Sequence, residues 1–279
     1  MFRTSIIIIF VVVVGKSNQK NSKDQESSMI DIIDLTYPTT WEGLSDFYGA
    51  MEKRWKICVN CGIPGLGTAI HMGHTSYEGS VKPAVIPTEY LLTRLEIIDV
   101  SYLAKLDPDL SLSLDVARQW SILKRDPKES TLLLFKFGWK QTSTKRQCVC
   151  RIPGISYELA DWIASNLSHV VGIGTDAPTL ETHETRELSA RTVSNVLGKS
   201  GIYIIANVHL RKRLPAHSCM SIAMPLKLLE AHYVPTRLTA FCPSRKTDRK
   251  ATIALMNKPL PLHIQKSRMF EVNLNEILN

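Results

Sequence analysis

No stretch of this sequence is apolar for long enough to span a membrane as a helix. The N-terminal apolar run extends only from Ile6 to Val14, whereas a spanning helix needs about 20 apolar residues. Arg3 precedes this run and Lys16 follows it. We favour a secretory signal peptide over a buried first strand, because the following stretch is polar. The pattern predicts a signal peptide over residues 1–17, a flexible N-terminus over residues 18–28, and a secreted, extracellular protein.

The chain also lacks a long polar linker and an internal repeat, so the sequence predicts a single domain. With 279 residues, 44% of them hydrophobic, the chain can bury one sizeable core. The predicted domain covers residues 29–243, and a less regular C-terminal extension covers residues 244–279. The formal charge of +8 is scattered, and the densest basic run, Arg211–Arg213, has no interleaved aromatics. We therefore expect no nucleic-acid partner.

The cysteines do not show the spacing of an ordinary zinc site. Cys58 and Cys61 could form half of one, but no second pair with suitable spacing follows. In a secreted chain, some of the cysteines are expected to form disulfides, and the others to be buried thiols. Residues 166–168 read Asn-Leu-Ser, an N-glycosylation sequon that is usable only in the secretory pathway and in an exposed loop. The six cysteines are Cys58, Cys61, Cys148, Cys150, Cys219 and Cys242.

Hydrophobic patterning predicts strands and helices that alternate loosely along the chain. Short apolar runs rich in β-branched residues predict strands, and apolar residues at helical spacing after a capping residue predict helices. The alternation predicts an α/β or mixed α+β class. The predicted strands cover residues 29–35, 95–100, 131–137, 170–173, 201–208, 221–228 and 237–241, and the predicted helices cover residues 113–124, 156–166 and 192–197.

Six short phrases stand in order over roughly residues 30 to 243. They are Asp34-Leu35-Thr36, Phe137-Gly138-Trp139, Pro153–Ser156, Val171–Pro178, Ile202–Val208 with Leu214-Pro215, and Met224–Leu228. Each phrase alone is weak evidence, but together and in this order they are specific. In these phrases the chain resembles the cyclase family, which includes kynurenine formamidase-like (arylformamidase-type) metal-dependent hydrolases.

The resemblance implies a swivelling β/β/α cyclase-like fold and a divalent metal, zinc or manganese. It also implies hydrolysis of a small aromatic amide such as N-formylkynurenine, a step of tryptophan-to-kynurenine catabolism. Family members are often dimers, so a homodimer is a further expectation. The chemistry explains the metal, which lowers the pKa of a bound water towards about 7 and polarises the amide carbonyl.

The family places most of its metal site in the motif H-x-G-T-H-x-D-x-P-x-H, and this chain keeps little of it. His71 and Gly73 match the first positions, so the resemblance makes His71 a metal ligand. His74 is either the second metal histidine, shifted by one residue, or the catalytic acid/base histidine after a deletion. We prefer the deletion, because it aligns the downstream Glu78-Gly79 and Ile86-Pro87 with the family's E-G and I-P. Under either alignment the motif aspartate is absent.

Two later ligand positions of the family are also changed. Ser194 stands in the place of a histidine, and Ala206 stands in the place of a glutamate. A stable zinc site normally takes at least three protein ligands, so two hypotheses follow. The chain is an arylformamidase-type hydrolase in which other residues, such as Glu78, Glu181 or His183, replace the lost ligands. Alternatively, it is a secreted pseudoenzyme that binds a small molecule or protein and holds no metal.

A gene-model or splicing artefact that drops a segment between Gly73 and His74 is a third explanation for the short motif. It would not restore Ser194 or Ala206, which lie within intact phrases. No serine-hydrolase site takes the place of the metal, because Ser218 and Ser221 lack G-x-S-x-G surroundings.

Overall fold

The computed structural model describes ten stretches of the chain. They are residues 30–43, 67–73, 81–120, 128–140, 151–182, 184–185, 192–210, 214, 218–229 and 231–244. None of the helices within these stretches is both long and apolar enough to cross a membrane.

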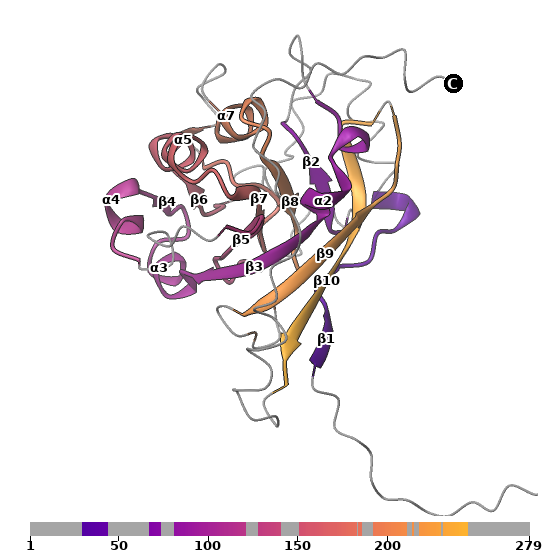
Figure 1. Ribbon diagram of the computed structural model, residues 1–279. Helices are drawn as coiled ribbons and strands as arrows, with labels where there is room; N and C mark the ends of the chain where they lie inside the picture. Colours follow the sequence, from indigo (N-terminus) through magenta and orange to yellow (C-terminus); the bar gives the residue numbers. More distant parts are fainter. Residues whose placement is uncertain are drawn as a thin grey trace, which may run out of the picture.

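The described residues fold around one closed β-sheet (Figure 1). Seven strands follow one another in the order β10-β2-β8-β7-β5-β3-β9, and β9 then pairs with β10 to complete a barrel. β1 lies outside the ring and pairs antiparallel with the second half of β10. The strands are β1 (Ile30–Asp34), β2 (Ala69–His71), β3 (Leu92–Asp99), β5 (Thr131–Lys136), β7 (Val170–Thr175), β8 (Tyr203–Ala206), β9 (Cys219–Pro225) and β10 (Tyr233–Pro243).

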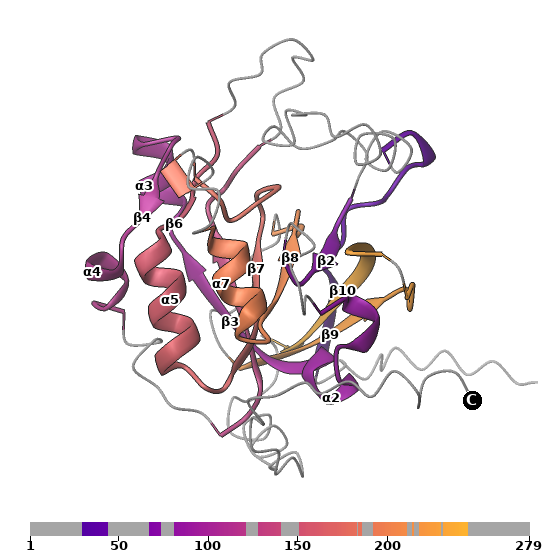
Figure 2. The same cartoon turned by 90° about the horizontal axis from the view of Figure 1, so that it is seen from above.

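One half of the barrel is parallel and carries the longer helices. β3, β5, β7 and β8 pair in parallel, and Figures 1 and 2 show α5 and α7 side by side against this half. Parallel neighbours need crossover connections, which these helices supply. The remaining elements are the short pair β4 (Ser111–Leu112) and β6 (Gly154–Ile155) and the helices η2 (Pro83–Val85), α2 (Thr88–Leu91), α3 (Ser101–Leu106), α4 (Leu114–Ala117), α5 (Tyr157–Asn166) and α7 (Val193–Lys199).

Alternation along the strands builds two hydrophobic cores. Along β5, Leu132 and Leu134 face the barrel interior, whereas Leu133 and Phe135 pack outside against the helices. This is the period of two that a strand buried on both faces requires. Inside the barrel, the Tyr203 ring occupies the space beside Gly172, where an added Cβ would lie 2.2 Å from the ring.

The predicted fold class is confirmed, since the structure is a single mixed α/β domain with a barrel-like sheet. Most predicted strands are present, although β10 covers eleven residues rather than the five expected. The predicted helix over residues 113–124 was too long, because α4 ends at Ala117 and turn residues follow. β2 was not predicted, because a strand of three residues gives too little pattern to recognise.

Candidate functional site

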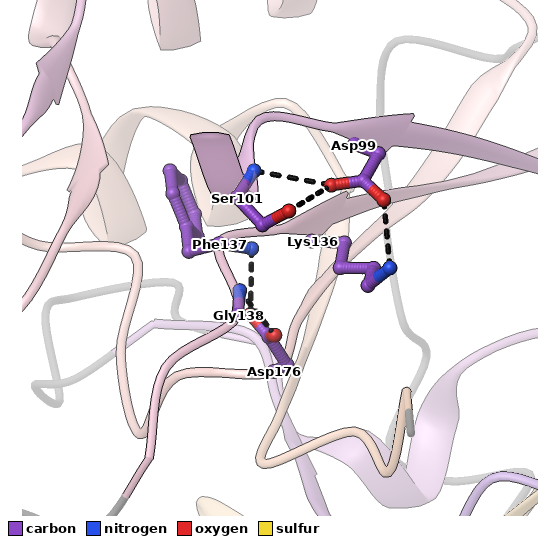
Figure 3. A network of polar contacts seen from close by, with 6 residues as sticks. All are labelled: Asp99, Ser101, Lys136, Phe137, Gly138 and Asp176. Carbon is purple, nitrogen blue, oxygen red and sulfur yellow. Dashed lines mark hydrogen bonds and ion pairs between the residues drawn. The ribbon is translucent and has the colours of Figure 1, made fainter. Parts of the chain in front are cut away.

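Polar side chains meet where the parallel strands β3, β5 and β7 end (Figure 3). In α/β proteins, both open sheets and barrels place their ligand sites beyond the carboxyl ends of the parallel strands. Asp176 comes directly after β7, and its two carboxylate oxygens accept the N–H groups of Phe137 at 2.8 Å and Gly138 at 2.7 Å. Burial raises the pKa of Asp176 to about 6, although these two hydrogen bonds favour the charged form. The aspartate thus links the end of β5 to the end of β7.

A second carboxylate at this edge, Asp99, ends β3. Its Oδ2 pairs with Lys136 Nζ at 2.6 Å, and its Oδ1 accepts the Ser101 hydroxyl at 2.6 Å and the Ser101 N–H at 3.1 Å. Burial raises the pKa of Asp99, but the contacts with Lys136 and Ser101 outweigh burial and hold that pKa below its ordinary value. The pair is half exposed, so we expect it to orient the strand ends more than to stabilise the fold.

The end of β8 is held by a different set of polar contacts. Asn207 has a left-handed backbone with φ of 56°, which asparagine tolerates better than most residues. Its side-chain amide donates to the Gly67 carbonyl at 3.0 Å, and its own carbonyl accepts the Thr68 hydroxyl at 2.6 Å. The Tyr37 N–H donates to the same hydroxyl at 2.8 Å. These bonds fix the start of β2 beside the end of β8. The two family metal positions His71 and Ala206 therefore lie on neighbouring strands.

His71 ends β2 and is almost fully buried, with 1% of its surface exposed. Its ring stacks on the Tyr233 ring with 5.1 Å between centroids. The strand register pairs His71 with Ile204, and it pairs Ala69 with Ala206 on the same strands. Ile204 belongs to the outer core beneath the helices, so His71 and Ala206 both lie on the helix-covered face of the sheet.

Ser194 lies in the first turn of α7, which packs on that outer face. Its side chain is buried, and its hydroxyl makes no hydrogen bond with the described residues. Its N–H donates to Glu181 Oε1 at 2.8 Å, and the Val193 N–H donates to Oε2 of the same carboxylate at 3.1 Å. A carboxylate is favoured at a helix N-terminus, where the first N–H groups lack partners within the helix.

Glu181 therefore has a structural task that the sequence did not reveal. The sequence suggested it as a replacement metal ligand, but both of its oxygens hold the start of α7. The Thr192 hydroxyl caps the same helix by accepting the Asn195 N–H, but no sequence pattern links Glu181 to this helix start. His74, Glu78 and His183 lie outside the described residues.

The donors found on the described residues do not fit a zinc or manganese ion. His71 offers an imidazole, Ser194 offers a neutral hydroxyl, and Ala206 offers nothing. Nor do His, Cys, Asp or Glu residues gather in groups of three or more within the described stretches. A structural zinc site takes four such ligands and a catalytic one takes three.

Comparisons with known proteins bear on this architecture. The family described as "Putative cyclase" matches residues 33–182, just over half of the chain. A comparison with curated proteins gives no match.

Solved structures support the same fold. Isatin hydrolase A from Labrenzia aggregata bound to benzyl benzoate is 20% identical with a TM-score of 0.58, and the alignment covers 77% of this chain and 95% of that one. Isatin hydrolase A from Ralstonia solanacearum is 18% identical with a TM-score of 0.57, covering 76% and 92%. A potential metal-dependent hydrolase with cyclase activity is 20% identical with a TM-score of 0.54, covering 77% and 99%. By its sequence match, and with a barrel that these structures share, the chain belongs to the cyclase family.

Proposed function

We propose that this protein is an arylformamidase-type hydrolase of the cyclase family whose inherited reaction is strongly weakened. That reaction is the metal-dependent hydrolysis of an aryl formamide such as N-formylkynurenine, on the route from tryptophan to kynurenine. The observation that carries the proposal is the neutral character of Ser194 and Ala206 on the helix-covered face of the barrel.

The substrate class rests on the fold and on the names of the structural relatives. Two of them are described as isatin hydrolases, and isatin is itself a cyclic aryl amide. A third is described as a potential metal-dependent hydrolase with cyclase activity. An aryl amide is therefore the substrate class that the two isatin hydrolases suggest for this chain, and the sequence phrases favour an open-chain formamide within that class.

The weak activity follows from the donors. A hydroxyl that keeps its proton binds zinc poorly, and a methyl group does not bind it at all. With His71 as the only imidazole among the described family positions, we expect loose, substoichiometric metal binding. A metal, if bound, would supply the activated water of the family's reaction, so low metal occupancy is expected to give a low maximal rate.

The test combines metal analysis with an activity assay. The purified protein is equilibrated with zinc or manganese, its metal content is measured, and hydrolysis of N-formylkynurenine is followed by absorbance. We expect less than one metal ion per chain and slow turnover. Stoichiometric metal with fast turnover would overturn the proposal.

A pair of engineered variants sharpens the result. Ser194→His with Ala206→Glu returns both family ligands, and Ser194→Asn with Ala206→Gln adds side chains of similar size without strong metal donors. Metal content and rate should rise in the first variant and not in the second. Equal behaviour of the two folded variants would show that these positions do not limit metal binding.

The second candidate is a secreted pseudoenzyme that binds a small aromatic amide without cleaving it. The buried stack of His71 on Tyr233 favours this candidate, because the histidine is already packed within the protein. A rise in melting temperature with N-formylkynurenine or isatin, together with no product even when metal is supplied, would support it. Formation of the hydrolysis product would instead support the weak arylformamidase-type hydrolase.

A further inference from the structure

We propose that the chain passes through the secretory pathway and carries one N-linked glycan, attached to Asn166. The sequence offers one Asn-x-Ser/Thr sequon, formed by Asn166, Leu167 and Ser168. A sequon is used only when its asparagine can hold a bulky, solvated group at the surface. The geometry of the end of α5 meets this condition.

The three residues of the sequon alternate between surface and core. Asn166 is the last residue of α5 and is exposed, as is Ser168 in the turn that follows. Leu167 between them is 6% exposed and belongs to the outer hydrophobic core. Its N–H donates to the Ile163 carbonyl at 3.0 Å, so the turn is anchored while the asparagine and serine face outward.

The amide of Asn166 can carry a sugar without breaking its contact in the fold. Its nitrogen donates one hydrogen to the Trp162 carbonyl at 2.9 Å, and a primary amide has two hydrogens. Attachment of the glycan forms a bond from Nδ2 to the sugar C1 and removes the other amide hydrogen as a proton. The C1–oxygen bond to the diphosphate of a lipid-linked oligosaccharide breaks, and the lipid diphosphate leaves. The secondary amide that results keeps one N–H for Trp162.

The position also leaves the candidate site open. Asn166 lies just before β7, at the edge of the sheet where β5 begins with Thr131. The Thr131 N–H donates to the His169 carbonyl at this edge. Asp176 and the other polar residues of Figure 3 follow the opposite ends of these strands. The six residues of β7 separate the two sides by roughly 20 Å at about 3.3 Å per residue.

An independent observation points to the same compartment. Cys219 of β9 and Cys242 of β10 form a disulfide, and each residue is only 1% exposed. Disulfides persist in oxidising compartments such as the endoplasmic reticulum, where N-glycans are added. A buried disulfide and an exposed sequon on one domain are what a secretory protein would carry.

The experiment expresses the full chain, with its own N-terminus, in a eukaryotic secretory host. We expect protein in the medium that becomes smaller by one glycan after treatment with peptide N-glycosidase, and conversion of Asn166 to aspartate in the treated peptide. The Asn166→Gln and Ser168→Ala variants should both run at the deglycosylated size before treatment. Ser168→Thr is the matched control and should keep the glycan, because threonine also completes the sequon.

Two results would overturn the inference. The first is protein that stays in the reducing cytosol, with free thiols at Cys219 and Cys242. The second is secreted, folded protein whose mobility does not change with the glycosidase. Because neither readout depends on hydrolysis, a failure here is distinct from a failure of the proposed activity.

Discussion

The disulfide between Cys219 and Cys242 cross-links the two strands whose pairing closes the barrel, and its loss should cost a large part of the stability of the fold. β9 and β10 form the last pair of the ring, and the register continues beyond Met220 and Phe241 to these cysteines. In the strand register, Cys219 also pairs with Leu95 of β3, and Cys242 pairs with Asp31 of β1. The disulfide therefore lies where four strands, β1, β3, β9 and β10, come together.

The size of the effect follows from the loop that the disulfide closes. The two cysteines are 23 residues apart, and restricting a loop of that length in the unfolded chain stabilises the fold by about 3.5 kcal/mol. Typical domains unfold with about 5–15 kcal/mol, so this loss would be a large fraction of the total. Because the sulfur atoms are buried in the inner core, an alanine pair would add the loss of apolar contacts.

Urea unfolding measures this contribution, followed by circular dichroism with and without a thiol reductant. The free energy of unfolding of the native chain should fall by about 3.5 kcal/mol on reduction. The Cys219→Ala, Cys242→Ala variant is the matched control, since its remaining response to reductant reports the other four cysteines. If the native chain and this variant respond equally to reductant, the proposed role of this disulfide is refuted.

Three further predictions concern single side chains. Glu181→Ala should lower the free energy of unfolding by about 2–4 kcal/mol in urea titrations, because two buried N–H groups of α7 lose their acceptor, and Glu181→Gln should cost less because it keeps one acceptor. Burial raises the pKa of Asp176 to about 6 from an ordinary value of 3.8. The contribution of Asp176 to the free energy of unfolding is therefore greatest below pH ~4, and it should fall by up to about 3 kcal/mol as the pH rises through about 6. If the stability–pH curve of the Asp176→Asn variant keeps this decline, Asp176 is not its cause. Gly172→Ala should cost about 1–3 kcal/mol in thermal unfolding, because its methyl group meets the Tyr203 ring, and failure of the additional Tyr203→Leu change to recover stability would argue against that clash.

Local patterning was enough to place many of the strands and the main helix. The apolar run of β5 and the Ser-capped start of α5 carry their own signals, because strand and helix periods act within a few residues. The family phrases identified the fold for a related reason, since they include turns such as the one that Asp176 ties to β5. The changes at Ser194 and Ala206 were also readable directly, because residue type alone decides whether a side chain can bind a metal.

What only the tertiary structure decided were partnerships between residues far apart in the chain. Six cysteines allow 15 pairings, and the Cys219–Cys242 bond is selected by the register of β9 on β10. Glu181 could have been a metal ligand by its sequence, yet packing places its carboxylate under the start of α7. The physical reason is that the period of a strand or helix is set by nearby residues, whereas closure of a barrel and burial of a charge depend on which distant groups share the same core.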